Sequence, residues 1–294
     1  SSMILKTIFR NDLNIISHHS LLTTYCSPGG ERGSSPGFPV LFLHGLGENH
    51  LTWEKILDRL DLRHYRTIVV DLPGHGPSTT IRMQNYSHCH LSSLLVDLFQ
   101  KMGIKKVIIV GHSLGANLAL RMASQNPEMV QSLFLLSPAI FSVRGLPLSR
   151  FVFANPLLHP FIIRVANKTL RSPEKLKTTL QEAVFNSDIV DDDFFQRIAQ
   201  PVLDNPRSAL ALSCYLRDSS RNHVLPKLAA INQPTVILHG LQDPWVPIAE
   251  SFRLTKILSS ATLIQIPDCG HMPQEEKPDL VTQQLTSFLS FKYQ

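Results

Sequence analysis

The chain has 294 residues, of which 43% are hydrophobic, so it is long enough to bury a sizeable core in one large domain or two small ones. Its formal net charge of +5 is spread along the sequence without a basic cluster, which argues against nucleic acid as a partner. The four cysteines are far apart and have no C-x-x-C spacing. Their distribution excludes a zinc cage or a dense disulfide framework and favours reduced thiols.

Membrane association is not expected from the apolar segments. The region before Arg10 lacks the long apolar core of a signal peptide. The most apolar later stretch, residues 151–166, is interrupted by polar residues and prolines, which disqualifies it as a membrane span. We therefore expect a globular protein without stable membrane insertion, in the cytoplasm.

Strand-like and helix-like segments alternate along most of the chain, which predicts an α/β fold with a mostly parallel central sheet flanked by helices. The first two predicted strands, 4–10 and 20–26, have no helix between them, so we expect them to form an antiparallel edge. The remaining predicted strands are 40–43, 67–70, 107–110, 133–136, 235–238 and 262–266, and the predicted helices are 53–60, 88–102, 114–125, 248–258 and 278–291.

The alternation of strands and helices fails between residues 139 and 231. Amphipathic helical segments such as 173–185 and 192–199 replace it, separated by several prolines. We predict that 139–231 is a helical cap inserted into a core domain made of residues 1–138 and 232–294.

A serine between two glycines stands where a predicted strand passes into a helix, in the sequence Gly111-His112-Ser113-Leu114-Gly115. This arrangement fits the G-x-S-x-G nucleophile elbow, whose tight turn needs small neighbours and exposes the serine hydroxyl. The helix that follows also presents unpaired N–H groups that favour a developing oxyanion. Ser113 is therefore the predicted nucleophile.

A serine nucleophile needs a histidine base, and that histidine needs an acid to hold its tautomer. In this architecture the chain order is serine, acid, histidine. Asp243 and His271 satisfy that order, and each follows a late predicted strand. Asp268 is the local alternative for the acid, but a position in the same short loop as His271 favours a turn-capping role.

The oxyanion requires backbone donors, and we expect these to be the N–H groups of Leu46 and Leu114. Leu46 lies in a glycine-containing loop after the strand that ends at Leu43. His44 is interpreted as a structural hydrogen-bonding residue rather than a second base. The tentative substrate pocket comprises His44, Gly45, His112, Phe141, Trp245 and Met272.

With these residues in hand, the sequence resembles the α/β-hydrolase fold family. The resemblance is carried by His44-Gly45-Leu46-Gly47 with Trp53, by 71–78 (DLPGHGPS), by the elbow at Ser113, by Asp243 in DPWVP and by Gly270-His271. It implies a central sheet, a cap over the active site and no cofactor. A serine at position 113 disfavours the members of the family that use an aspartate nucleophile.

The expected activity is hydrolysis of carboxylic esters, with thioesters or acylglycerols as further candidates, and the expected partner is a small-molecule ester. A carbon–carbon bond hydrolase of ring-cleavage products, a cofactor-free perhydrolase and a receptor that signals through its cap remain alternatives. His88-Cys89-His90 starts a predicted helix and has no second ligand group at matching spacing, so no metal site is expected. A monomer or homodimer is expected.

Overall fold

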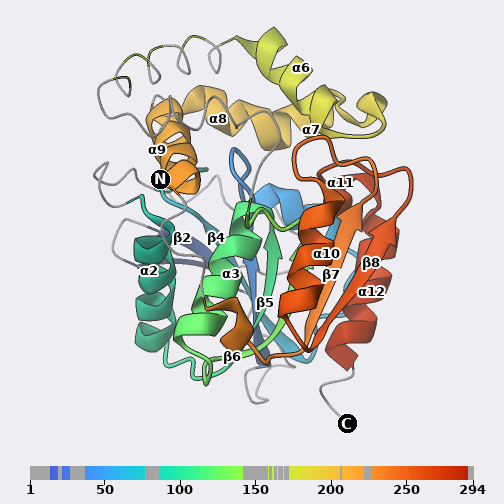
Figure 1. Cartoon of the computed structure of the whole chain (residues 1–294). Helices are drawn as coiled ribbons and strands as arrows, with labels where there is room; N and C mark the ends of the chain where they lie inside the picture. Colours follow the sequence, from blue (N-terminus) through green and yellow to red (C-terminus); the bar gives the residue numbers. More distant parts are fainter. Residues whose placement is uncertain are drawn as a thin grey trace.

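The computed structural model describes residues 14–18, 22–26, 37–76, 78, 86–141, 158, 161, 164, 168, 172–205, 207–221 and 227–290. Within these residues the central sheet has eight strands in the order β1-β2-β4-β3-β5-β6-β7-β8. The six strands from β4 to β8 are parallel, as predicted for an α/β fold, and Figure 1 shows the helices on both faces. These strands are β3 (Phe38–Leu43), β4 (Tyr65–Asp71), β5 (Val107–His112), β6 (Val130–Leu136), β7 (Thr235–Gly240) and β8 (Ala261–Ile266).

The antiparallel edge of the sheet differs in part from its prediction. The predicted strand 20–26 corresponds to β2 (Leu22–Cys26), which pairs antiparallel with β4. Its other neighbour is β1 (Asn14–His18), a strand that the sequence pattern did not reveal. The predicted strand 4–10 lies outside the described residues.

Two hydrophobic cores form because successive side chains of a strand point to opposite faces of the sheet. In β3, Leu41 and Leu43 join the core on one face, whereas Val40 and Phe42 join the core on the other. Since helices cover both faces, the parallel strands are apolar on both sides. The first core contains side chains of α2 (His88–Lys101), α3 (Leu114–Gln125) and α10 (Ile248–Ile257), and the second those of α1 (Glu54–Leu57) and α12 (Pro278–Ser290).

Local signals set the ends of helix α2 as predicted. The Ser87 side chain accepts a hydrogen bond from the His90 N–H at the start of the helix. Gly103, just past the end, has a φ of +68°, a conformation that costs glycine little. The predicted helix 53–60 is instead a 3-10 turn, η1 (His50–Trp53), followed by the short α1, because Asn49 caps the chain earlier through Leu51 N–H.

Between β6 and β7 the described helices α6 to α9 lie together at one end of the sheet, at the top of Figure 1, whereas the 3-10 turn η5 (Leu228–Ala230) contacts α3. Their small core includes Leu180, Phe194 and Ile198, and it also takes in Met272 from the opposite side of the site. The helix predicted over 192–199 continues to Asp204, with residues 195–199 (η4) in π-helical geometry. The elements are α6 (Pro173–Ala183), η3 (Ser187–Ile189), α7 (Asp192–Phe194), η4 (Phe195–Ala199), α8 (Gln200–Asp204) and α9 (Ser208–Arg221).

Candidate active site

Ser113 occupies a sharp turn between β5 and α3. Its backbone has φ +50° and ψ −108°, a region that non-glycine residues rarely adopt. The neighbouring glycines are required by close approach: a Cβ on Gly115 would lie 2.1 Å from the Leu43 carbonyl oxygen, and one on Gly111 would lie 2.8 Å from Ala116 N. The turn therefore forms only with glycine at these positions, and it presents the serine hydroxyl at the carboxyl end of the sheet.

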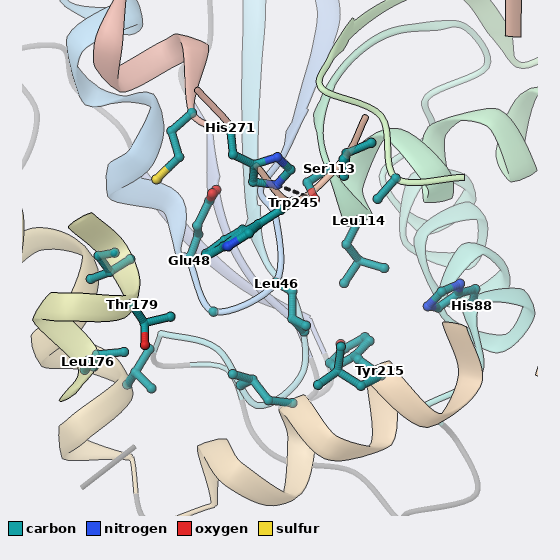
Figure 2. Close-up of a pocket in the computed structure, with 18 residues that line it drawn as sticks. Leu46, Glu48, His88, Ser113, Leu114, Leu176, Thr179, Tyr215, Trp245 and His271 are labelled. Atoms are coloured by element: carbon teal, nitrogen blue, oxygen red, sulfur yellow. Dashed lines mark hydrogen bonds between the residues drawn. The ribbon is translucent and has the colours of Figure 1, made fainter. Parts of the chain in front are cut away.

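The structure brings together the three side chains that the sequence singled out. The Ser113 hydroxyl lies 3.0 Å from His271 Nε2, and His271 Nδ1 lies 2.7 Å from Asp243 Oδ2 (Figure 2 shows the first of these bonds). Because an ionised carboxylate only accepts hydrogen bonds, the imidazole carries its proton on Nδ1 and leaves Nε2 free to accept from the serine. All three residues are buried.

Asp243 is held in its ionised form by a set of donors. Its Oδ1 accepts from the N–H groups of Trp245 and Val246 at 2.9 and 2.8 Å. Its Oδ2 also lies 3.2 Å from His239 Nε2. Burial alone would raise the pKa of Asp243, but His271, His239 and the Val246 N–H together hold that pKa far below its usual range. The carboxylate stays charged throughout the pH range in which proteins are stable.

The loop of residues 44–48, called the oxyanion loop here after its predicted role, contains a backbone N–H group without an acceptor in the described part of the chain. Gly45 N–H donates to Glu48 Oε2 at 3.0 Å, and Gly47 N–H donates to His75 Nε2 at 3.1 Å. Between them, the Leu46 N–H has no acceptor among the described residues, and the same holds for the Leu114 N–H at the start of α3. Two amides on neighbouring segments are thus left for a ligand oxygen.

A cavity of about 370 Å³ opens on Ser113 and His271. In Figure 2, Leu176 and Thr179 of α6 lie on the opposite side of the cavity from His88, with Leu46 between them. The described residues that line the cavity include no lysine or arginine. They are Leu46, Gly47, Glu48, His88, Ser113, Leu114, Ala139, Leu176, Thr179, Leu180, Val202, Leu212, Tyr215, Leu216, Trp245, Val246, His271 and Met272.

Four residues of the tentative pocket do not line this cavity, whereas Trp245 and Met272 do. His44 is fully buried, where its Nδ1–H donates to the Gly45 carbonyl and its Nε2 accepts from Leu72 N–H. Gly45 and His112 lie behind the cavity wall against each other. Phe141 packs on the core of α2 and α3 with the Arg253 guanidinium 4.0 Å from its ring centre. The placement of His44, Gly45, His112 and Phe141 in the substrate pocket stays a prediction, which the lining of this cavity does not support.

Sequence reasoning missed most of the cavity wall. Helices α6, α8 and α9 contribute Leu176, Leu180, Val202, Leu212 and Leu216, and no sequence signal separates these positions from others on amphipathic helices. Tyr215 also has a structural role, because its hydroxyl donates to the Pro73 carbonyl at 3.1 Å and thereby links α9 to the loop after β4.

A metal site or a membrane span would each need a specific arrangement within the part of the chain that the structure describes. That part contains no group of three or more histidine, cysteine or acidic side chains placed to hold a metal ion. No helix in it has both the length and the apolar character needed to cross a bilayer. The cytoplasmic location and the monomeric or homodimeric state stay predictions.

Comparison with known proteins places the chain in a family. The chain belongs to the alpha/beta hydrolase fold family, whose model matches residues 39–278. It is 25% identical over 260 residues to the uncharacterized hydrolase YugF of Bacillus subtilis, covering 88% of this chain and 93% of that one. It is 28% identical to the 2-hydroxy-6-oxononadienedioate/2-hydroxy-6-oxononatrienedioate hydrolase of Comamonas testosteroni, covering 86% and 88%. A crystal structure of a candidate lipase of Acinetobacter baumannii AYE matches with a TM-score of 0.75 and 26% identity, covering 94% and 90%.

The family membership makes the chain a hydrolase of this fold, as the resemblance of its motifs implied. The relatives include both a candidate lipase and a carbon–carbon bond hydrolase. Family membership therefore does not determine which bond this chain cleaves, and the residues that line the cavity are the evidence for that choice.

Proposed function

We propose that the protein is a serine hydrolase that cleaves carboxylic esters of neutral substrates with a hydrophobic part. The observation that carries this proposal is the hydrogen-bonded series Ser113–His271–Asp243 at the edge of a largely aliphatic cavity. A serine hydroxyl activated by a histidine is suited to attack on a carbonyl carbon, which gives an acyl-enzyme that water then hydrolyses.

Each residue has a defined role in the proposed mechanism. His271 Nε2 takes the proton of Ser113 as the hydroxyl attacks, and the same proton then passes to the leaving alcohol. Asp243 keeps the proton on His271 Nδ1 and stabilises the imidazolium that forms. The N–H groups of Leu46 and Leu114 stabilise the negative oxygen of the tetrahedral intermediate. In the second half of the cycle His271 activates water in the same way.

The charge of the cavity favours a neutral ester over the anionic substrates of carbon–carbon hydrolases. The substrate in the name of the Comamonas testosteroni relative is a dioate, which carries two carboxylates. The described wall of this cavity has no lysine or arginine to pair with such groups, and it already contains the Glu48 carboxylate. An anion without a partner in an apolar cavity is costly, so the carbon–carbon hydrolase is the less favoured alternative.

The helices over the cavity support a further part of the proposal, that residues 139–231 form a cap that shapes substrate selection. Leu176 and Leu180 of α6 and Leu212 and Leu216 of α9 line the cavity, and Figure 2 shows Leu176 across it from Ser113. Aliphatic walls on both sides of a nucleophile suit an ester with a hydrophobic acyl or alcohol group.

Labelling with a fluorophosphonate probe, followed by turnover of p-nitrophenyl esters of increasing chain length, tests the proposed function. We expect the wild-type protein to be labelled and to hydrolyse the esters, and Ser113→Ala to lose both properties while it stays folded. Ser213→Ala, which removes another buried serine hydroxyl, is the matched control and keeps both. Sustained ester turnover by Ser113→Ala, or turnover of dienoate ring-cleavage products but not of esters, would contradict the proposal.

A further inference from the structure

A buried ion pair joins the oxyanion loop to the strand that carries the nucleophile. Glu48 Oε1 lies 2.8 Å from His112 Nδ1, and the two residues are 5% and 0% exposed. Burial raises the pKa of Glu48 and lowers that of His112, but mutual attraction and their hydrogen bond outweigh it. The pKa of Glu48 therefore lies below its ordinary value and that of His112 above it, which favours the charged form of both partners.

The second functional atom of each partner holds a different segment of the site. Glu48 Oε2 accepts from Gly45 N–H at 3.0 Å, which fixes the backbone next to the predicted donor Leu46. His112 Nε2–H donates to the main-chain carbonyl of His271 at 2.7 Å. The pair thus connects the segments that carry the oxyanion donor, the nucleophile and the base.

The contacts leave little room for these segments to shift. A Cβ on Gly45 would lie 2.9 Å from His112 Nδ1 and 3.2 Å from both Glu48 Oε1 and Ser113 Cβ. The ion pair and the nucleophile therefore border the same small space. Gln274 of α11 (Pro273–Glu276) closes the other side, with its side-chain amide group 3.2 Å from His112 Nδ1.

We propose that Glu48 and His112 are positioning residues, whose ion pair holds the Leu46 N–H and the main chain of His271 in register with Ser113. This inference rests on the proposed function, since it concerns the same reaction. Neither side chain needs to touch the substrate's reacting atoms. A displacement of about 1 Å at such a site is enough to cost on the order of a hundredfold in rate.

The charge of the pair also matters, because the Glu48 carboxylate lines the cavity where an oxyanion forms. While His112 is protonated, it compensates that carboxylate. Above the pKa of His112 the negative charge of Glu48 is unopposed, and it disfavours the oxyanion. The other charged or titratable groups facing the pair are His44 and His75 toward Glu48, and His271 and Asp243 toward His112. We therefore expect kcat to fall at alkaline pH.

Two substitutions separate position from charge. Glu48→Ala removes the hydrogen bonds to Gly45 and His112, and we expect it to lower kcat by about a hundredfold with little change in KM, because the oxyanion donor acts in the transition state. Glu48→Gln keeps an acceptor for Gly45 N–H and a polar contact with His112. It should recover at least about tenfold of that loss, and it should abolish the alkaline fall of kcat.

Glu275→Gln is the matched control, since it also neutralises a buried carboxylate close to His271 in the sequence but does not contact the pair. It should lower thermal stability and leave the shape of the pH profile unchanged. A second measurement does not depend on activity: in the Ser113→Ala protein, NMR of the His112 ring should show a protonated imidazole at pH 7, which becomes neutral when Glu48→Gln is added.

Each outcome decides one of the two proposals. Wild-type kcat in Glu48→Ala, an alkaline fall that persists in Glu48→Gln, no recovery by Glu48→Gln, or a neutral His112 at pH 7 in Ser113→Ala would overturn the positioning role. If the wild-type protein cleaves no ester, the proposed function fails instead. The NMR measurement then still decides whether the ion pair exists.

Discussion

His239 Nε2 lies 3.2 Å from Asp243 Oδ2, the same oxygen that accepts from His271 Nδ1. His239 is itself fixed, because its Nε2 also lies 2.9 Å from the Val246 carbonyl and its Nδ1 lies 2.6 Å from the Ser251 hydroxyl. Asp243 is therefore oriented by a fully buried imidazole in addition to the backbone amides of its own loop. An acid held in this way can set the tautomer of His271 without moving.

The first prediction concerns Asp243→Asn. We expect kcat for p-nitrophenyl esters to fall by about 10³–10⁴-fold, because an amide that donates to His271 favours the wrong tautomer. His239→Gln, which leaves the carboxylate in place, should cost only about tenfold. Steady-state kinetics with circular dichroism as a folding control measures both effects. Equal losses in the two variants would show that the contribution of Asp243 to kcat depends on its orientation rather than on its carboxylate charge.

The second prediction concerns the elbow. Gly115→Ala places a methyl group 2.1 Å from the Leu43 carbonyl oxygen, which is backbone and cannot turn away. We expect the free energy of unfolding to drop by about 4 kcal/mol or more. Gly103→Ala is the matched control: no atom lies within 4 Å, and only its φ of +68° opposes the change, which costs about 1 kcal/mol. Urea denaturation of both variants measures the difference, and similar losses would contradict the close-approach argument.

The third prediction concerns the link between η4 and α11. Arg197 donates to both carboxylate oxygens of Glu275 at 2.9 and 3.1 Å, and Lys55 lies 3.0 Å from Glu275 Oε2. Arg197→Met leaves the buried carboxylate with a half-buried lysine alone, so we expect a loss of about 3–5 kcal/mol in the free energy of unfolding.

Exchanging both partners of this link gives its internal control. Arg197→Met combined with Glu275→Met should recover much of the lost stability, because no buried charge is then left without a partner. Arg63→Ala, which removes an exposed ion pair with Asp61, should leave stability unchanged. If the double variant were less stable than Arg197→Met, the attraction within the ion pair, rather than the cost of leaving the Glu275 carboxylate without Arg197, would account for the loss of stability. Urea denaturation measures all of these variants.

The fourth prediction concerns stability and pH. Burial lowers the pKa of His75 to about 3 and that of His88 to about 4, and it lowers the pKa of His44. At pH values between these folded pKa values and the unfolded pKa of about 6.5, the unfolded chain binds protons that the folded chain does not. The free energy of unfolding therefore falls as the pH drops through this range. His112 has a raised pKa, so its contribution is full below pH of about 6.5 and is lost as the pH rises through its folded pKa.

Stability should therefore be highest near pH of about 6.5. His75→Gln keeps an acceptor for the Gly47 N–H and removes one titrating group. Below the pH of maximum stability, this variant should reduce the slope of the free energy of unfolding against pH by about 1.4 kcal/mol per pH unit where His75 contributes fully. Urea denaturation between pH 4 and 9 is the measurement, and an unchanged acid slope in His75→Gln would contradict the assignment.

The sequence by itself determined the parallel strands, the elbow and the loops that carry Asp243 and His271. These are local features: apolar runs reveal buried strands, and a serine between two glycines after such a run indicates a tight turn in which only small neighbours fit. Because parallel strands end at the same edge of the sheet, residues that follow them are expected to lie close together. The structure brings Ser113, Asp243 and His271 together as that rule requires.

Only the tertiary structure decided which other residues surround the nucleophile. His44, Gly45 and His112 lie next to site residues in the sequence, but whether a residue lines the cavity depends on the segments that pack around it, and none of the three lines the cavity. The contact between Glu48 and His112 joins segments that are distant in the chain, so no local pattern encodes it. The cavity walls from α6, α8 and α9 depend in the same way on where amphipathic helices dock, which periodicity alone does not fix.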